Sequence, residues 1–164
     1  NPKNKMTDEA KLHLQRAENE LVAAQILFKI SNNQTLQKEQ FLLEKDFTFY
    51  SLAIGHSYYC IFNSAKAILI NEGIKTDSPE VHKKTIKAFE DYLVKTGKLD
   101  VALLKIYTKM IVRAEQLLGI FYSEKQKRGE FTYQKLPQAN RGPAQESIGN
   151  AEFFFKHINK ILGK

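Results

Sequence analysis

The sequence has very little cysteine and no long apolar run. Cys60 is the single cysteine among 164 residues, so no disulfide framework can form, and a reducing cytoplasm is the expected environment. Apolar runs such as AILI and FLL are far shorter than the ~20 residues that a membrane-spanning helix needs. The amino end also has no signal-peptide core. These absences predict a soluble cytoplasmic protein without a membrane partner.

Several sequence signatures of enzymes are missing as well. There is no phosphate-binding glycine loop, no G-x-S-x-G nucleophile elbow and no acid pair suited to glycoside hydrolysis. The histidines are scattered, and no two histidines or cysteines stand at the spacing of metal ligands. We therefore expect no metal and no cofactor, and the sequence offers little from which to build an independent catalyst.

Basic residues are in excess. The chain carries 25 Lys and Arg against 18 Asp and Glu, which gives a formal net charge of +7. Such a charge favours acidic partners, of which nucleic acid is the commonest. The length suits one domain that spans residues 1–164 and buries a substantial core.

Apolar residues recur at steps of three and four in five segments, and no segment alternates with period two for long enough to form a strand. Between them we expect a polar connector over 31–45, with an apolar patch at 41–43 that adds a turn or extends the next helix, and a loop over 129–143. The predicted fold is an all-α, five-helix, up-and-down antiparallel bundle. Its helices are expected over about 7–30, 46–73, 79–96, 100–126 and 144–162.

Residues 46–73 are predicted to form the central helix, because they carry two apolar faces. Asp46 is the expected N-cap, and Gly73 the expected left-handed stop. One face carries large side chains: Phe47, Tyr50, Ile54, Ile61, Ala65 and Ile68. The other carries small ones: Ala53, Ser57, Cys60, Ser64 and Ala67. Two further start signals follow, Ser78-Pro79 for the third helix and Asp100 for the fourth.

The run SYYCIFNSAKAILINEG at 57–73 resembles the signature helix of the HEPN domain family. Three further pieces are similar to elements of that family in the same order: AENELVAAQILF at 17–28, RGEFTY at 128–133 and AEFFFKHINKIL at 151–162. The resemblance covers most of the chain. It implies a four-helix core with an additional helix, a homodimer with a groove by the long helices, and a minimal nucleotidyltransferase as partner, often in a toxin-antitoxin module.

HEPN ribonucleases carry an arginine that is followed after four to six residues by a histidine, and this chain has no such pair. At the matching place Arg128 is followed by Tyr133, whose phenol has a pKa of about 10 and is a poor base at neutral pH. This argues against an enzyme without deciding the question. We infer a non-catalytic HEPN protein that binds nucleotide or RNA, acts as partner of a minimal nucleotidyltransferase, or both. The alternatives are a divergent metal-independent ribonuclease that uses His56 or another histidine, and a plain helical protein-interaction module.

The binding candidates lie on the fourth helix and in the loop that follows it. A basic stripe at steps of four leads toward Arg128, which with Tyr133 could hold an anion and stack on a base. Each candidate also has a structural interpretation: a salt bridge, a solvated face, or a histidine satisfied by a neighbour. The candidates for nucleotide or RNA binding are Arg128, Tyr133, Lys105, Lys109, Arg113 and Lys127, and His56 is a candidate to line a groove.

Overall fold

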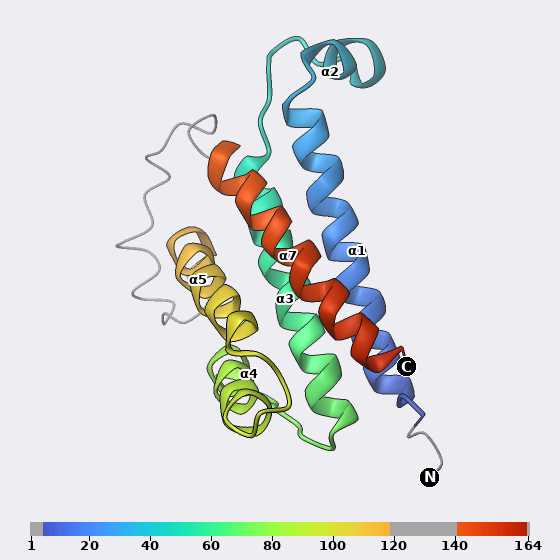
Figure 1. The fold of residues 1–164 in the computed structure, drawn as a ribbon. Coiled ribbons are helices and arrows are strands. Elements are labelled where there is room, and N and C mark those ends of the chain that lie inside the picture. Colours follow the sequence, from blue (N-terminus) through green and yellow to red (C-terminus); the bar gives the residue numbers. More distant parts are fainter. Residues whose placement is uncertain (1–4, 119–140, 164) are drawn as a thin grey trace.

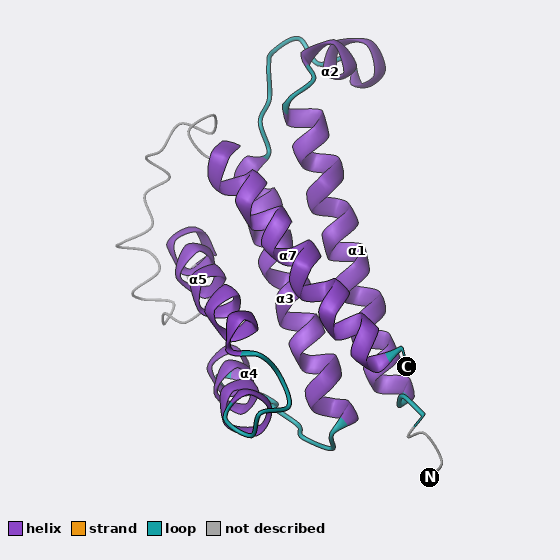
Figure 2. Ribbon diagram, viewed as in Figure 1, coloured by secondary structure: helices purple, strands orange, loops and turns teal. Residues whose placement is uncertain are grey.

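The computed structural model describes residues 5–118 and 141–163, and every regular element in this part of the chain is a helix (Figures 1 and 2). The all-α bundle predicted from the sequence is confirmed. The elements are α1 (Asp8–Ser31), α2 (Gln34–Phe41), α3 (Tyr50–Asn71), α4 (Val81–Ala88), the π-helix η1 (Phe89–Val94), α5 (Val101–Leu118) and α7 (Arg141–Leu162).

Helix α3 is the centre of the bundle. It packs against α1, α7, α5 and α4. Helix α1 runs antiparallel to α3, whereas α7 runs in the same direction as α3 (Figure 1). Both predicted faces of α3 are buried except at Phe47, which precedes the helix. The Cys60 thiol lies 4.0 Å from the carbonyl of Ala151 in α7, so Cys60 lies at the contact between α3 and α7. Burial raises the pKa of this thiol to about 12, and Cys60 is therefore a buried apolar residue.

The start of α3 differs from the prediction. The helix begins at Tyr50, so Asp46 does not cap it. Instead, the buried side chain of Gln37 accepts a hydrogen bond from Phe47 N and donates to the carbonyls of Phe47 and Ile30, each at 2.8 Å. These bonds hold the preceding segment in an extended path, and Phe47 is 42% exposed rather than turned inward.

The connector predicted over 31–45 contains the helix α2. The side chain of Asn33 caps this helix by accepting a hydrogen bond from Leu36 N at 2.9 Å. The helix ends at Leu42, which has a left-handed backbone with φ of 56° and is 82% exposed. The apolar patch at 41–43 therefore ends a separate helix and does not extend α3.

The junction between α3 and α4 is fastened by a buried lysine. Gly73 ends α3 with φ of +79°, as predicted. Beyond it, Lys66 donates from Nζ to the carbonyl of Thr76 at 2.9 Å, and the Thr76 hydroxyl lies 2.7 Å from that of Thr85 in α4. Burial lowers the pKa of the Lys66 ammonium. The predicted start at Ser78-Pro79 is wrong, because α4 begins at Val81, after Glu80, whose backbone is left-handed.

The last two helices are close to their predicted starts. Asp100 accepts a hydrogen bond from Ala102 N at 2.8 Å, which confirms its role as a cap for α5. Helix α7 begins at Arg141, three residues before the predicted start, so residues 141–143 belong to a helix and not to the loop. The predicted extension of α5 to residue 126 and the rest of the predicted loop lie outside the described residues.

Candidate functional site

Two cations of the predicted basic stripe bind a carboxylate of α7. Arg113 Nη2 lies 3.0 Å from Glu146 Oε2, and Lys109 pairs with the other oxygen of the same carboxylate. Arg113 also donates from Nη1 to the Ser147 hydroxyl at 3.0 Å and to the Pro143 carbonyl at 3.2 Å. The hydrogen bonds from Lys109 and Arg113 lower the pKa of the Glu146 carboxyl. Lys109 and Arg113 therefore connect α5 to α7, and the two cations together with Glu146 have a net charge of +1.

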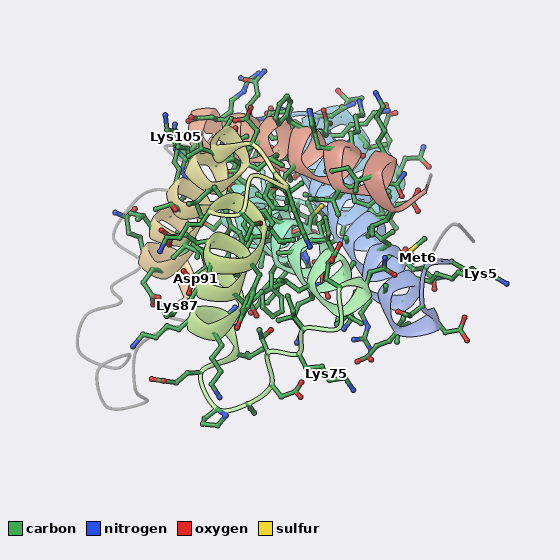
Figure 3. All side chains as sticks on the ribbon, turned by 60° about the horizontal axis from the view of Figure 1, so that its bottom comes forward. Lys5, Met6, Lys75, Lys87, Asp91 and Lys105 are labelled. Atoms are coloured by element: carbon green, nitrogen blue, oxygen red, sulfur yellow. The ribbon has the colours of Figure 1, made fainter. Side chains whose placement is uncertain are left out.

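Lys105 is the third residue of the stripe. It lies one turn before Lys109, is exposed, and forms no ion pair with a residue in the described ranges (Figure 3). Its role as a phosphate contact stays a prediction.

The other predicted binding residues cannot be placed. Lys127, Arg128 and Tyr133 lie outside the described residues. Whether Arg128 and Tyr133 share a cleft therefore stays a prediction as well.

His56 contacts an acidic residue of the neighbouring helix. Its Nδ1 lies 2.5 Å from Oε2 of Glu20 in α1, and both side chains are about one third exposed, at 36% and 30%. This is the structural interpretation given above, a helix histidine satisfied by a neighbour. The same contact also orients the imidazole, since it leaves Nε2 on the side away from the carboxylate.

The aromatic residues of the run 57–73 differ in burial: one lies in the core, and two are partly exposed. Tyr58 is fully buried, and its hydroxyl lies 2.7 Å from Nδ1 of His82 in α4. Burial raises the pKa of Tyr58 and lowers that of His82. Tyr59 and Phe62 are half-buried beside His82, with ring centroids 6.0 and 4.5 Å from the imidazole. Tyr58 is thus a core residue and not a ligand contact.

A polar pocket lies where three helices begin. Its volume is about 560 Å³, and it is lined by residues at the junction of α1 and α2, before and at the start of α3, and at the start of α7. The lining residues that matter most are Asn33, Thr35, Phe47, Thr48, Tyr50 and Arg141.

Positive charge at the pocket has two sources, while the carboxyl end of α1, whose Ser31 and Asn32 also line the pocket, adds partial negative charge. Among the described residues that line the pocket, Arg141 is the single charged one. The amino ends of α2, α3 and α7 also meet there, and each places partial positive charge and backbone amides at its first turn. Asn33 caps α2 with its own side chain, whereas no described side chain caps α3. The Tyr50 hydroxyl donates to Asn32 Oδ1, which fixes the ring in the wall of the pocket.

The sequence analysis did not find this pocket. Its residues fall in the predicted connector, at the predicted start of the central helix and in the predicted loop, and no periodic pattern shows that these segments meet. The available signals were Asn33 as a cap and Arg141 before Gly-Pro, but neither indicates that the two lie together in space.

No group of three or more histidine, cysteine or acidic side chains in residues 5–118 and 141–163 could hold a metal ion. Over the same ranges, no helix combines the length and apolar character required to cross a membrane.

No protein-family model matches the chain. A protein of Methanocaldococcus jannaschii named "Putative toxin MJ0605" is 27% identical to it over 155 residues, which are 94% of this chain and 90% of that protein. A protein of Thermotoga maritima named "UPF0332 protein" is 28% identical over 110 residues, 67% of this chain and 70% of that protein. The HEPN resemblance thus has no matching family model and stays a prediction.

Proposed function

We propose that this protein is a component of a toxin-antitoxin-type module and binds the phosphate of a nucleotide or of RNA in the pocket around Arg141. The observation that carries the proposal is the meeting of Arg141 with the amino ends of α2, α3 and α7 around a cavity of about 560 Å³. The similarity to a relative named as a toxin, over nearly the whole chain, supports the module.

The pocket offers more than charge. A phosphate can bind the Arg141 guanidinium and backbone amides at a helix start, because both carry positive charge. The exposed ring of Phe47 lies nearly parallel to that of Phe49, with centroids 6.4 Å apart and planes 8° apart, and it offers a flat surface for a base. Asn33, Thr35 and Thr48 supply amide and hydroxyl groups for the sugar or the base edge.

A binding role without catalysis fits the pocket lining. None of the described residues that line it is a histidine, an aspartate or a glutamate, the usual groups that accept or donate a proton near neutral pH. This supports the interpretation that the protein binds its ligand without cleaving it.

The binding test compares the unmodified protein with Arg141→Ala. Binding of 5′-AMP and of a fluorescein-labelled ten-residue oligouridine is measured by calorimetry and by fluorescence anisotropy. Loss of a charge-assisted contact worth about 1.5–3 kcal/mol predicts a Kd that rises about 10–100-fold for both ligands. Lys29→Ala is the matched control, because Lys29 is an exposed cation of α1 outside the pocket. Unchanged affinity in Arg141→Ala, or no binding by the unmodified protein, would refute the proposal.

We also propose a homodimer and a minimal nucleotidyltransferase as partner. The support is the sequence resemblance and the toxin name of the relative. Light scattering after size-exclusion chromatography measures the first, and co-purification with the product of an adjacent nucleotidyltransferase gene measures the second. A monomeric mass would contradict the homodimer. The lack of such a gene, or of a complex with its product, would contradict the nucleotidyltransferase partner.

One observation favours a second candidate, the divergent metal-independent ribonuclease. The Glu20 carboxylate holds the imidazole of His56, and a histidine held in this way can act as a general base through Nε2. Under this candidate the protein cleaves structured RNA in the presence of a chelator, and His56→Ala abolishes cleavage. If neither RNA binding nor cleavage is observed, the plain protein-interaction module becomes the better interpretation.

A further inference from the structure

Helix α7 carries an exposed strip of aromatic and basic side chains away from the pocket. The strip is defined here as Phe153, Lys156, His157 and Lys160, which follow each other at steps of one to four residues on one side of the helix. All four side chains are exposed. These residues belong neither to the pocket nor to the predicted basic stripe of α5.

The aromatic part of the strip is a pair of rings. Phe153 is 44% exposed, and its ring centroid lies 4.1 Å from that of His157, at an interplanar angle of 38°. His157 is further fixed by its Nδ1, which lies 2.9 Å from the Phe153 carbonyl. An exposed ring held in place by a neighbour is a platform on which a nucleic-acid base can stack.

The charge of the strip is not neutralised within the described ranges. Lys156 and Lys160 form no ion pair there. The carboxylates of α7 are engaged elsewhere: Glu146 with Lys109 and Arg113, and Glu152 as acceptor of a 2.7 Å hydrogen bond from Gln25 in α1.

Lys105 extends the positive surface from the neighbouring helix. Helices α5 and α7 are antiparallel, because Arg113 and Lys109 contact Glu146 whereas Met110 contacts Asn150. Residues nearer the start of α5 therefore lie beside residues nearer the end of α7. Lys105, one turn before Lys109, therefore lies closer to Phe153 along the bundle axis than Lys109 does. Phe153 is two turns beyond Glu146 on the same face of α7. Figure 3 shows Lys105 on the outer side of α5.

We propose that the α7 strip, together with Lys105, is a docking surface for single-stranded RNA, with Phe153 stacking on a base and the lysines contacting phosphates. The support is charge complementarity combined with an exposed ring, the two features of sequence-tolerant single-strand sites. The inference rests on the proposed function for the class of ligand. Phe153 lies twelve residues after Arg141, about 18 Å along the helix, so a mononucleotide cannot contact both sites whereas an oligonucleotide can.

The experiment uses the full chain, 5′-AMP and the labelled ten-residue oligouridine over a series of salt concentrations. Phe153→Ala is expected to weaken RNA binding about tenfold or more, since it removes one base-stacking contact. The double variant Lys156→Ala/Lys160→Ala is expected to reduce the slope of log affinity against log salt by about 1.4, at about 0.7 for each phosphate of a single strand. Affinity for 5′-AMP stays unchanged in both. Tyr92→Ala and Lys29→Ala are matched controls, because they remove an exposed aromatic residue of η1 and an exposed cation of α1.

The outcomes separate this inference from the proposed function. If the strip variants bind RNA as the unmodified protein does while Arg141→Ala weakens both ligands, the strip proposal is wrong and the pocket proposal holds. If the strip variants weaken RNA binding but Arg141→Ala changes neither ligand, the strip proposal holds and the pocket proposal is wrong. If the unmodified protein binds 5′-AMP but not RNA, the strip proposal is wrong and the pocket proposal holds for a nucleotide; if it binds neither ligand, both proposals are wrong. Circular dichroism verifies that each variant is folded, which is expected because the replaced side chains are exposed.

Discussion

Two buried tyrosines show how the environment of one hydroxyl group decides its contribution to stability. Tyr58 and Tyr107 are both fully buried, and burial raises the pKa of each phenol. The Tyr58 hydroxyl contacts His82, whereas the Tyr107 hydroxyl has no hydrogen-bond partner among the described residues. Because a buried hydroxyl without a partner loses its hydration for no gain, the two residues should respond oppositely to replacement by phenylalanine.

Tyr58→Phe is expected to lower the free energy of unfolding by about 1–2 kcal/mol, because it removes the hydrogen bond between the Tyr58 hydroxyl and His82. Tyr107→Phe is expected to leave the free energy of unfolding unchanged or to raise it by up to about 1 kcal/mol. Urea denaturation monitored by circular dichroism measures both. A loss above about 1 kcal/mol in Tyr107→Phe would mean that the hydroxyl has a partner beyond the described residues.

At the scale of elements, the short helix α2 shapes the wall of the pocket. Its buried Gln37 makes three hydrogen bonds, two of them to the backbone of Phe47, and thereby fixes the segment that precedes α3. Phe47 and Thr48 in this segment line the pocket. A residue outside the lining thus determines the position of residues within it.

Gln37→Leu keeps the approximate volume of the side chain and removes these hydrogen bonds. Because buried polar groups of the backbone are left unpaired, we expect a loss of about 1–3 kcal/mol in the free energy of unfolding and weaker binding of 5′-AMP. Gln25→Leu is the matched control, since its hydrogen bond to Glu152 lies at the surface. Equal effects of the two substitutions would show that Gln37 does not organise the pocket.

The elements that the sequence predicts well are those with a sustained apolar period. The buried residues of α1 recur at steps of three and four, and Thr7 and Asp100 act as caps of α1 and α5. The predicted N-cap at Asp46 and the predicted helix start at Pro79 are both wrong. Gln37 holds the chain extended beyond Asp46, and Pro79 lies in a turn before α4. Local signals do not contain either fact.

The candidate site was less predictable than the helices. The stripe on α5 was recognised as basic, but Glu146, which neutralises much of it, lies on a helix distant in sequence. The pocket depends on the same kind of information, because Arg141 meets the connector between α1 and α3 only in the folded chain. Patterns along a sequence indicate which face of a helix is apolar, but not which polar ends meet.

At the scale of the whole molecule, α5 is attached to the bundle partly by charge. Lys109 and Arg113 of α5 hold Glu146 of α7, and the hydrogen bonds from these two cations lower the pKa of the Glu146 carboxyl from its ordinary value of 4.5. A carboxyl whose pKa is lower in the folded than in the unfolded chain stabilises the fold fully above its unfolded pKa. That stabilisation is lost as the pH falls through the folded pKa.

We therefore compare the unmodified protein with Glu146→Gln between pH 7 and pH 2.5. The carboxylate is 44% exposed, so screening by water limits its contribution to about 1 kcal/mol or less. At pH 7 the variant should be less stable by up to that amount, and the difference should begin to shrink below the ordinary pKa of 4.5 and vanish as the pH falls through the lower pKa of the folded chain. The measurement is the thermal midpoint in buffers of equal ionic strength. A difference that does not depend on pH would assign the effect to packing and not to the ion pair.

The burial of Lys66 has a consequence for covalent labelling of the protein. Its ammonium is enclosed at the junction of α3 and α4, where it bonds to Thr76, while the cations on the outside of the helices are accessible to reagents. An amine-acylating reagent should therefore modify Lys66 last, at a rate set by the transient separation of these two helices. Peptide mass spectrometry over time would then measure the rate at which α3 and α4 separate locally.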